Sequence, residues 1–86
     1  MMMKKKNDTM GEFKRGDVIV KIDGNISYVV TGSFQTAMFY ELIFPNRNRD
    51  VWFKSELDVD YVDSEYVKVD HVGERKINEF YRRLVG

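Results

Sequence analysis

The chain has 86 residues, enough for one domain with one hydrophobic core. Hydrophobic residues make up 43% of it, a fraction too high for a disordered chain. It has no cysteine, which excludes disulfides, thiolate metal sites and thiol nucleophiles and leads us to expect a reducing compartment, the cytoplasm. Fourteen basic residues balance 14 acidic ones, so no global field attracts the chain to nucleic acid or an anionic membrane. No apolar run approaches the ~18 residues that a membrane-spanning helix needs.

The first third of the chain predicts a basic tail followed by a β-hairpin. Residues 1–11 consist of Met, Lys, Asn, Asp, Thr and Gly with no period, which is typical of a flexible tail. Apolar side chains then alternate over residues 18–22 and again over residues 26–31, as they do in half-buried strands. Asp23-Gly24 lies between these runs and predicts a tight turn. Gly32-Ser33 is expected to end the second strand.

Two further strands are expected on either side of a polar loop at residues 45–50. The run Phe34 to Phe44 is rich in aromatic residues and stops at Pro45, which favours a strand over a helix. A shorter strand follows at residues 51–55. If Phe44 lies opposite Val51, one face of this hairpin carries Tyr40, Leu42, Phe44 and Phe53, and the other carries Phe39, Ile43 and Trp52 beside a Glu41–Lys54 pair.

The last third changes from a period of two to a helical period. Residues 56–65 are acidic and fit a strand, a turn or a helical turn, and residues 66–69 predict a fifth strand. Ile77, Phe80, Tyr81 and Leu84 form one apolar stripe, which predicts a helix over 74–85. The expected organisation is therefore a tail at 1–11, a small β-barrel domain at 12–70 and a C-terminal helix at 71–86 packed on the barrel.

The opening hairpin carries a family resemblance. Lys14-Arg15-Gly16-Asp17-Val18-Ile19-Val20, followed by Gly24 and then Tyr28-Val29-Val30, resembles the start of SH3-like barrels of the KOW and Tudor kind. It is also similar to the start of small accessory proteins of bacterial viruses. The resemblance implies a mainly β fold with about five strands. The long third strand and the terminal helix depart from a minimal barrel.

The chemistry-bearing residues do not predict an enzyme. His71 is the only histidine, and the chain has no phosphate-binding glycine loop, dinucleotide fingerprint or hydrolase-type serine motif. We expect His71 to be a surface or hinge residue between the last strand and the helix. The acidic residues are expected to form a solvated face or to meet a basic partner, without the spacing of a calcium loop: Glu56, Asp58, Asp60, Asp63 and Glu65. No catalytic residue, cofactor or metal site is predicted.

The aromatic patch of Phe39, Ile43 and Trp52 has two interpretations. The terminal helix can pack its apolar stripe over the patch, which makes both surfaces core. Alternatively, the patch is exposed and binds a protein, with Trp52 as the hot spot, since tryptophan often dominates binding energy.

Three functions remain open at this stage. The first is a non-catalytic protein-binding or regulatory module, which the viral resemblance extends to a phage or mobile-element protein acting on a host protein. The alternative is a nucleic-acid-binding barrel that uses Arg47 and Arg49 in the polar loop, although the nearby acidic stretch opposes it. The second alternative is a structural or assembly subunit. No membrane partner is expected, and the chain is expected to be a monomer or a small homo-oligomer.

Overall fold

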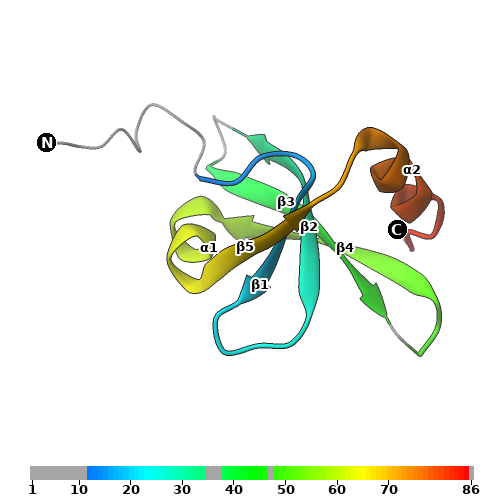
Figure 1. Cartoon of the computed structure of the whole chain (residues 1–86), viewed down its shortest axis with the longest axis horizontal. Helices are drawn as coiled ribbons and strands as arrows, with labels where there is room; N and C mark the ends of the chain where they lie inside the picture. The colour runs from blue at the N-terminus through cyan, green and yellow to red at the C-terminus, as the bar shows by residue number, and fades with distance from the viewer. Residues whose placement is uncertain (1–11, 35–37, 47, 86) are drawn as a thin grey trace, which may run out of the picture.

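The computed structural model describes residues 12–34, 38–46 and 48–85 (Figure 1). The expected basic tail, residues 1–11, and Arg47 lie outside the described residues. The elements in chain order are β1 (Asp17–Lys21), β2 (Ser27–Phe34), β3 (Phe39–Asn46), β4 (Val51–Asp58), α1 (Val59–Glu65), β5 (Tyr66–His71) and α2 (Glu74–Arg82).

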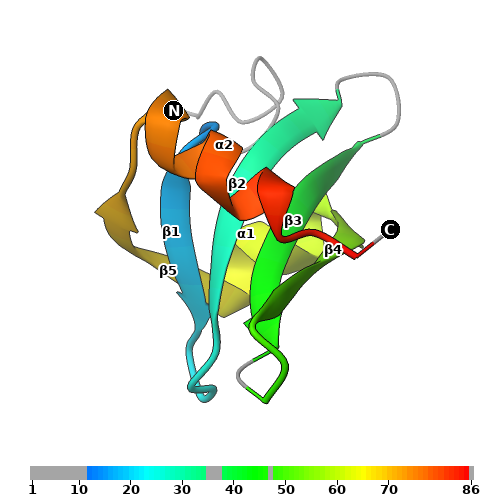
Figure 2. The same ribbon diagram turned by 90° about the vertical axis from the view of Figure 1, so that its right-hand side faces the viewer.

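The strands form one antiparallel sheet in the order β4-β3-β2-β1-β5. β1 to β4 follow one another as a meander, and β5 returns to pair with β1. α1 joins the two edge strands, β4 and β5, and α2 lies across the opposite face of the sheet (Figure 2). The expected fold class, mainly β with a C-terminal helix, is confirmed.

The first hairpin forms as expected, but its second strand is longer. Val18 lies opposite Val29, and the Gly24 amide donates to the Lys21 carbonyl at 2.9 Å in the turn. The expected strand end at Gly32-Ser33 is wrong, because β2 runs on to Phe34. A bulge at Thr31 absorbs one extra residue, so the strand bends and its pairing with β3 continues.

The second hairpin has a register two residues away from the expected one. Phe44 lies opposite Phe53, not Val51, because Pro45 and Asn46 belong to β3 and the turn comprises only residues 47–50. The last pair between β2 and β3 is Val29 with Ile43, and β3 continues beyond it. Pro45 lies in this continuation, so its lack of an N–H breaks no hydrogen bond to β2. A shift of two keeps every side chain on its expected face.

The acidic stretch is part strand and part helix. β4 continues to Asp58, whose carboxylate accepts a hydrogen bond from the Tyr61 amide at 3.1 Å and caps the N-terminus of α1. Val59 and Val62, three residues apart, are the buried residues of this short helix. α1 therefore fills the space between the two edge strands.

Each face of the sheet has its own hydrophobic cluster. The inner core faces α1 and consists of Phe13, Ile19, Val30, Tyr40, Leu42, Val59, Val62 and Tyr66. The outer core faces α2 and consists of Val29, Ile43 and Ile77, with Val18, Trp52, Val72, Phe80, Tyr81 and Leu84 packed around them.

Candidate functional site

The patch expected to bind protein lies under or beside α2. Ile43 is fully buried, and the Trp52 ring stacks on Phe80 with ring centroids 4.1 Å apart and planes 21° apart. Phe39 is half-buried opposite Asp58 at the far end of the same hairpin. The structure therefore does not bring these residues together as one open surface, and the helix stripe covers the centre of the patch.

Polar contacts hold α2 at both ends. At its N-terminus, the Arg15 guanidinium binds both carboxylate oxygens of Glu74, at 2.8 and 3.0 Å. In its last turn, the Tyr81 hydroxyl donates to Glu41 at 3.1 Å. Beyond α2, the Trp52 amide donates to the Arg83 carbonyl and its carbonyl accepts from the Val85 amide, both at 2.8 Å. Polar contacts therefore fix both ends of the helix to the rest of the domain.

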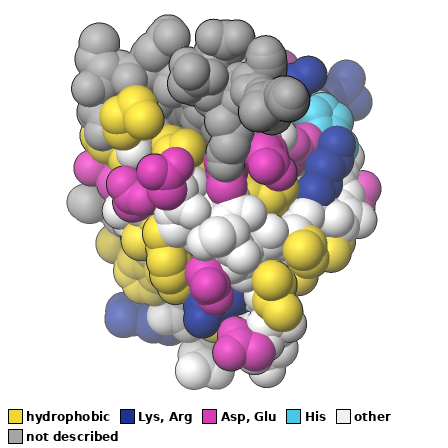
Figure 3. All heavy atoms as spheres, turned by 90° about the vertical axis from the view of Figure 1, so that its left-hand side faces the viewer, with side chains coloured by type: hydrophobic (Ala, Val, Ile, Leu, Met, Phe, Trp, Pro, Cys, Tyr) yellow, Lys and Arg dark blue, Asp and Glu magenta, His cyan; other side chains and the backbone are white. Residues whose placement is uncertain are grey.

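Some acidic residues of the stretch 56–65 make structural contacts, and others are exposed to solvent. Asp63 accepts a 2.7 Å hydrogen bond from the buried Tyr40 hydroxyl, and burial together with this carboxylate raises the pKa of Tyr40. Asp60 and Glu65 are exposed on α1. On the surface that includes α1 and β5, acidic and hydrophobic side chains are interspersed (Figure 3). Within the described residues, no group of three or more histidine or acidic side chains could hold a metal ion.

The Gly16-Asp17 pair has a structural role, because the Asp17 carboxylate is buried and makes three polar contacts. Asp17 accepts hydrogen bonds from the Lys14 amide and His71 Nδ1, at 2.9 and 2.8 Å, and pairs with Lys68 at 3.3 Å. Burial raises the pKa of Asp17, but these three partners outweigh burial and hold it below its usual value. Gly16 has φ +98°, and a Cβ there would lie 2.5 Å from the Val72 carbonyl oxygen. His71, the last residue of β5, thus has a structural partner.

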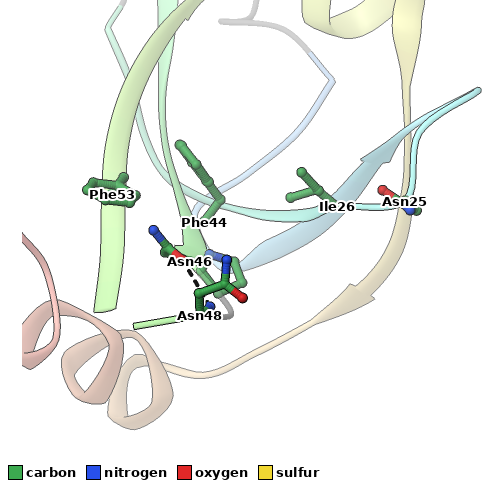
Figure 4. Close-up of a pocket in the computed structure, with 7 residues that line it drawn as sticks. Asn25, Ile26, Phe44, Asn46, Asn48 and Phe53 are labelled. Atoms are coloured by element: carbon green, nitrogen blue, oxygen red, sulfur yellow. Dashed lines mark hydrogen bonds between the residues drawn. The ribbon is translucent and has the colours of Figure 1, made fainter. Parts of the chain in front are cut away.

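A pocket lies at the end of the sheet where two turns meet (Figure 4). We call it the end groove. It is an open pocket of about 410 Å³. One wall comes from the turn between β1 and β2, and the other from β3, β4 and the turn between them. Its lining residues are Asn25, Ile26, Phe44, Pro45, Asn46, Asn48 and Phe53.

Aromatic rings form the floor of the end groove. Phe44 lies 5.1 Å from Tyr28 and 5.9 Å from Phe53, measured between ring centroids. Tyr28 continues the row to Tyr66 at 5.6 Å, in an edge-to-face arrangement. Burial raises the pKa of Tyr66 to about 12. Such tilted contacts are the geometry that aromatic pairs prefer.

The rim of the end groove is neutral among the described lining residues, and asparagine supplies most of its polar groups. The Asn46 carboxamide oxygen accepts a 3.0 Å hydrogen bond from the Asn48 amide and shapes the turn (Figure 4). Arg49, expected to bind nucleic acid, is exposed in the same turn, with its amide bonded to the Asn46 carbonyl at 3.2 Å. Arg47, its expected companion, lies outside the described residues.

A second pocket, of about 460 Å³, lies between α1, β5 and the segment before β1. Its lining includes Glu12, Asp63 and Lys68 beside the core residues Phe13 and Tyr66. It adjoins the start of the described chain, and two of its charged groups have partners within the protein, since Lys68 pairs with Asp17 and Asp63 accepts a hydrogen bond from Tyr40. We therefore centre the candidate site on the end groove.

The end groove was not predicted from the sequence, although a signal for it was present. Alternate turns of a meander lie at the same end of a sheet, so the turn after β1 and the turn after β3 must be neighbours. Both turns contain asparagine, and apolar residues flank them: Ile26 after the first turn, Phe44 and Phe53 around the second. Comparing these two turns would have found the pocket.

Comparison with protein-family models, curated proteins and solved structures finds no match to this chain. Within the described residues, no helix is both long and apolar enough to cross a bilayer.

Proposed function

We propose that this chain is a non-catalytic module that binds an extended segment of a partner protein in the end groove. The observation that carries the proposal is the groove itself, an open pocket with an aromatic floor and an asparagine rim between two turns. Small binding sites commonly combine apolar walls with a few polar groups that fix orientation. A rigid sheet supports both turns, as it does in many modules that bind through loops.

The lining suits a peptide better than a charged ligand. The faces of Phe44 and Phe53 offer apolar contact to one or two side chains of the partner. Each asparagine carboxamide offers a donor and an acceptor, which are the groups needed to pair with peptide N–H and C=O. Because the described lining residues carry no charge, we expect the affinity to depend little on salt.

The fold supports a binding role of this kind. Five antiparallel strands with β5 returning to β1 fit the SH3-like resemblance of residues 14–30, and small barrels of this kind serve as scaffolds for many sites. The similarity of the same segment to viral accessory proteins extends the proposal to regulation of a host protein. The absence of cysteine supports a cytoplasmic setting.

A second candidate is single-stranded nucleic acid in the same groove. Arg49 is exposed at its edge, and Arg47 lies between two groove asparagines in the sequence. Aromatic rings beside basic residues are the usual platform for bases and phosphates. The zero net charge and the pairing of neighbouring Asp50 with Arg83 at 3.3 Å weigh against it.

The test is selection of a random-peptide library on the immobilised domain, followed by titration of the enriched peptides. We expect Phe53→Ser to weaken binding at least about tenfold, since it removes one aromatic wall. Val69→Ser, which changes an exposed side chain on β5, should bind as the parent does. Circular dichroism checks that both variants fold, and Asn48→Ala tests the exposed rim without touching the core.

The outcomes separate the candidates. Enriched peptides that are lost with Phe53→Ser and retained with Val69→Ser support the proposal. If no peptide is enriched, and mixed oligonucleotides bind at low salt with an affinity that falls steeply as salt rises, the second candidate replaces it.

A further inference from the structure

β4 is an edge strand whose outward backbone groups can be assigned from the hydrogen bonds at its two ends. The Trp52 amide donates away from β3, to the Arg83 carbonyl at 2.8 Å. The Val59 amide, just past the strand, donates to the Met38 carbonyl on the β3 side at 3.1 Å. Because the direction alternates along a strand, Lys54 and Glu56 direct their N–H and C=O groups away from the sheet.

Two other stretches of the sheet edges, one on each edge strand, are already protected. The segment 83–85 pairs with β4 at Trp52, as an isolated bridge between Trp52 and Leu84 (Figure 2). At the opposite edge, β5 has a bulge at Val69, and the Asp70 carboxylate accepts the His71 amide at 2.7 Å. Bulges and capped amides discourage strand addition. The edge around Ser55 has no such protection among the described residues.

The sequence at this edge is complementary to itself. Phe53-Lys54-Ser55-Glu56-Leu57 is apolar at both ends, with a basic and an acidic residue on either side of a central serine. In an antiparallel pair of two copies centred on Ser55, Lys54 lies opposite Glu56 of the second copy, and Glu56 lies opposite its Lys54. On the other face of the strands, Phe53 of each copy lies opposite Leu57 of the other copy.

We propose that two copies of this chain associate through their β4 edges in this register. The contact is isologous, so each charge pair occurs twice by symmetry. Lys54 and Glu56, whose backbones face outward, exchange both hydrogen bonds with their counterparts. Longer pairing is blocked at Trp52 by the segment 83–85, which restricts the register to the one centred on Ser55. This association is separate from peptide binding in the end groove and does not depend on it.

The interface is short, so the dimer should form only at high protein concentration and weaken with salt. Sedimentation velocity from about 10 µM to about 1 mM at low ionic strength measures it. We expect Glu56→Lys to weaken dimerisation at least about tenfold, because it sets lysine against lysine in both symmetric pairs. Within one copy it replaces a like-charged pair, since Glu56 lies directly opposite Glu41, so the monomer should stay folded.

The double variant Lys54→Glu/Glu56→Lys restores opposite charges and should return dimerisation to near the parental value. A parent that remains monomeric at about 1 mM overturns the proposal. So does a dimer that resists Glu56→Lys, or a double variant that is folded by circular dichroism yet remains monomeric.

Discussion

The two faces of the sheet are both apolar, but they are covered in different ways. The inner core is closed by the path of the sheet itself, with α1 placed between the two edge strands. The outer core is closed by α2, a helix of nine residues that follows Gly73, together with the flanking residues Val72 and Leu84. A helix this short is not stable by itself in water, so α2 depends on the sheet it covers. The sheet face, in turn, needs α2 to bury Ile43 fully and Trp52 in part.

This difference explains why the aromatic patch had two interpretations. An apolar strand face looks the same in a sequence whether a helix of the same chain or a partner protein covers it. Here the helix stripe packs on Ile43 and Trp52 of the patch, whereas the half-buried rings of Phe44 and Phe53 line the open end groove. Of the four predictions below, the first two test how far the two cores differ in strength, and the other two test polar contacts of the sheet.

Leu42→Ala in the inner core should have the largest effect. Leu42 is fully buried among residues from several strands, so the cavity cannot collapse easily. We expect a loss of about 3–5 kcal/mol in the free energy of unfolding, measured by urea denaturation. A loss below about 1 kcal/mol would mean that this side chain is not in a rigid core.

Ile77→Ala in the outer core should cost less, about 2 kcal/mol, because α2 can shift to reduce the cavity. Trp52 is the only tryptophan and reports on the same contact. Its emission should move to longer wavelength as α2 loosens over it. If the loss equals that of Leu42→Ala and the emission is unchanged, the two cores are one unit and the distinction fails.

Asp17→Asn should cost about 1–2 kcal/mol near neutral pH, because it weakens three contacts to a buried carboxylate. The folded pKa of Asp17 lies below the ordinary value of 3.8. The contribution of Asp17 to the free energy of unfolding is therefore present above pH 3.8 and is lost as the pH falls through the folded pKa. Urea denaturation at about pH 7 and about pH 3 should show the gap between parent and variant shrinking in acid. A gap that stays constant contradicts this role.

Glu56→Lys should have the smallest effect, a gain of about 0.5 kcal/mol, since it places lysine opposite Glu41 on the outer face. Glu56→Gln is the matched control. It removes the like charge without adding an opposite one, so it should raise the free energy of unfolding by only part of that amount. Thermal unfolding at protein concentrations low enough to keep the chain monomeric measures both. A loss of stability in either variant contradicts the observed register.

The fold class, mainly β with a C-terminal helix, could be predicted because the hydrophobic period and the turn residues do not depend on the exact strand register. The expected register of the second hairpin was wrong by two residues, since Pro45 normally ends a strand but here lies where β2 no longer pairs. The faces were still correct, because side chains alternate with a period of two. The continuation of β2 through Gly32 depends on the bulge at Thr31, which no local pattern indicates.

The candidate site was harder to predict for a different reason. It is made by two turns that are about 20 residues apart and meet only because the strands form a meander. The expected site was instead inferred from residue type, because Phe39, Ile43 and Trp52 form an apolar cluster on a strand face that also carries Glu41 and Lys54. Residue type indicates which strand face is apolar. The position of α2 determines which part of that face remains exposed.

Mapping a selected peptide on the isotope-labelled domain by NMR chemical-shift perturbation tests binding in the end groove most directly. The largest shifts should fall on Asn25, Asn48 and Phe53 around the end groove. The single Trp52 indole resonance and the amide of Phe80 should stay in place. Large shifts at Trp52 and Phe80, with the groove unchanged, would mean that α2 moves aside and that the face beneath it is the binding surface.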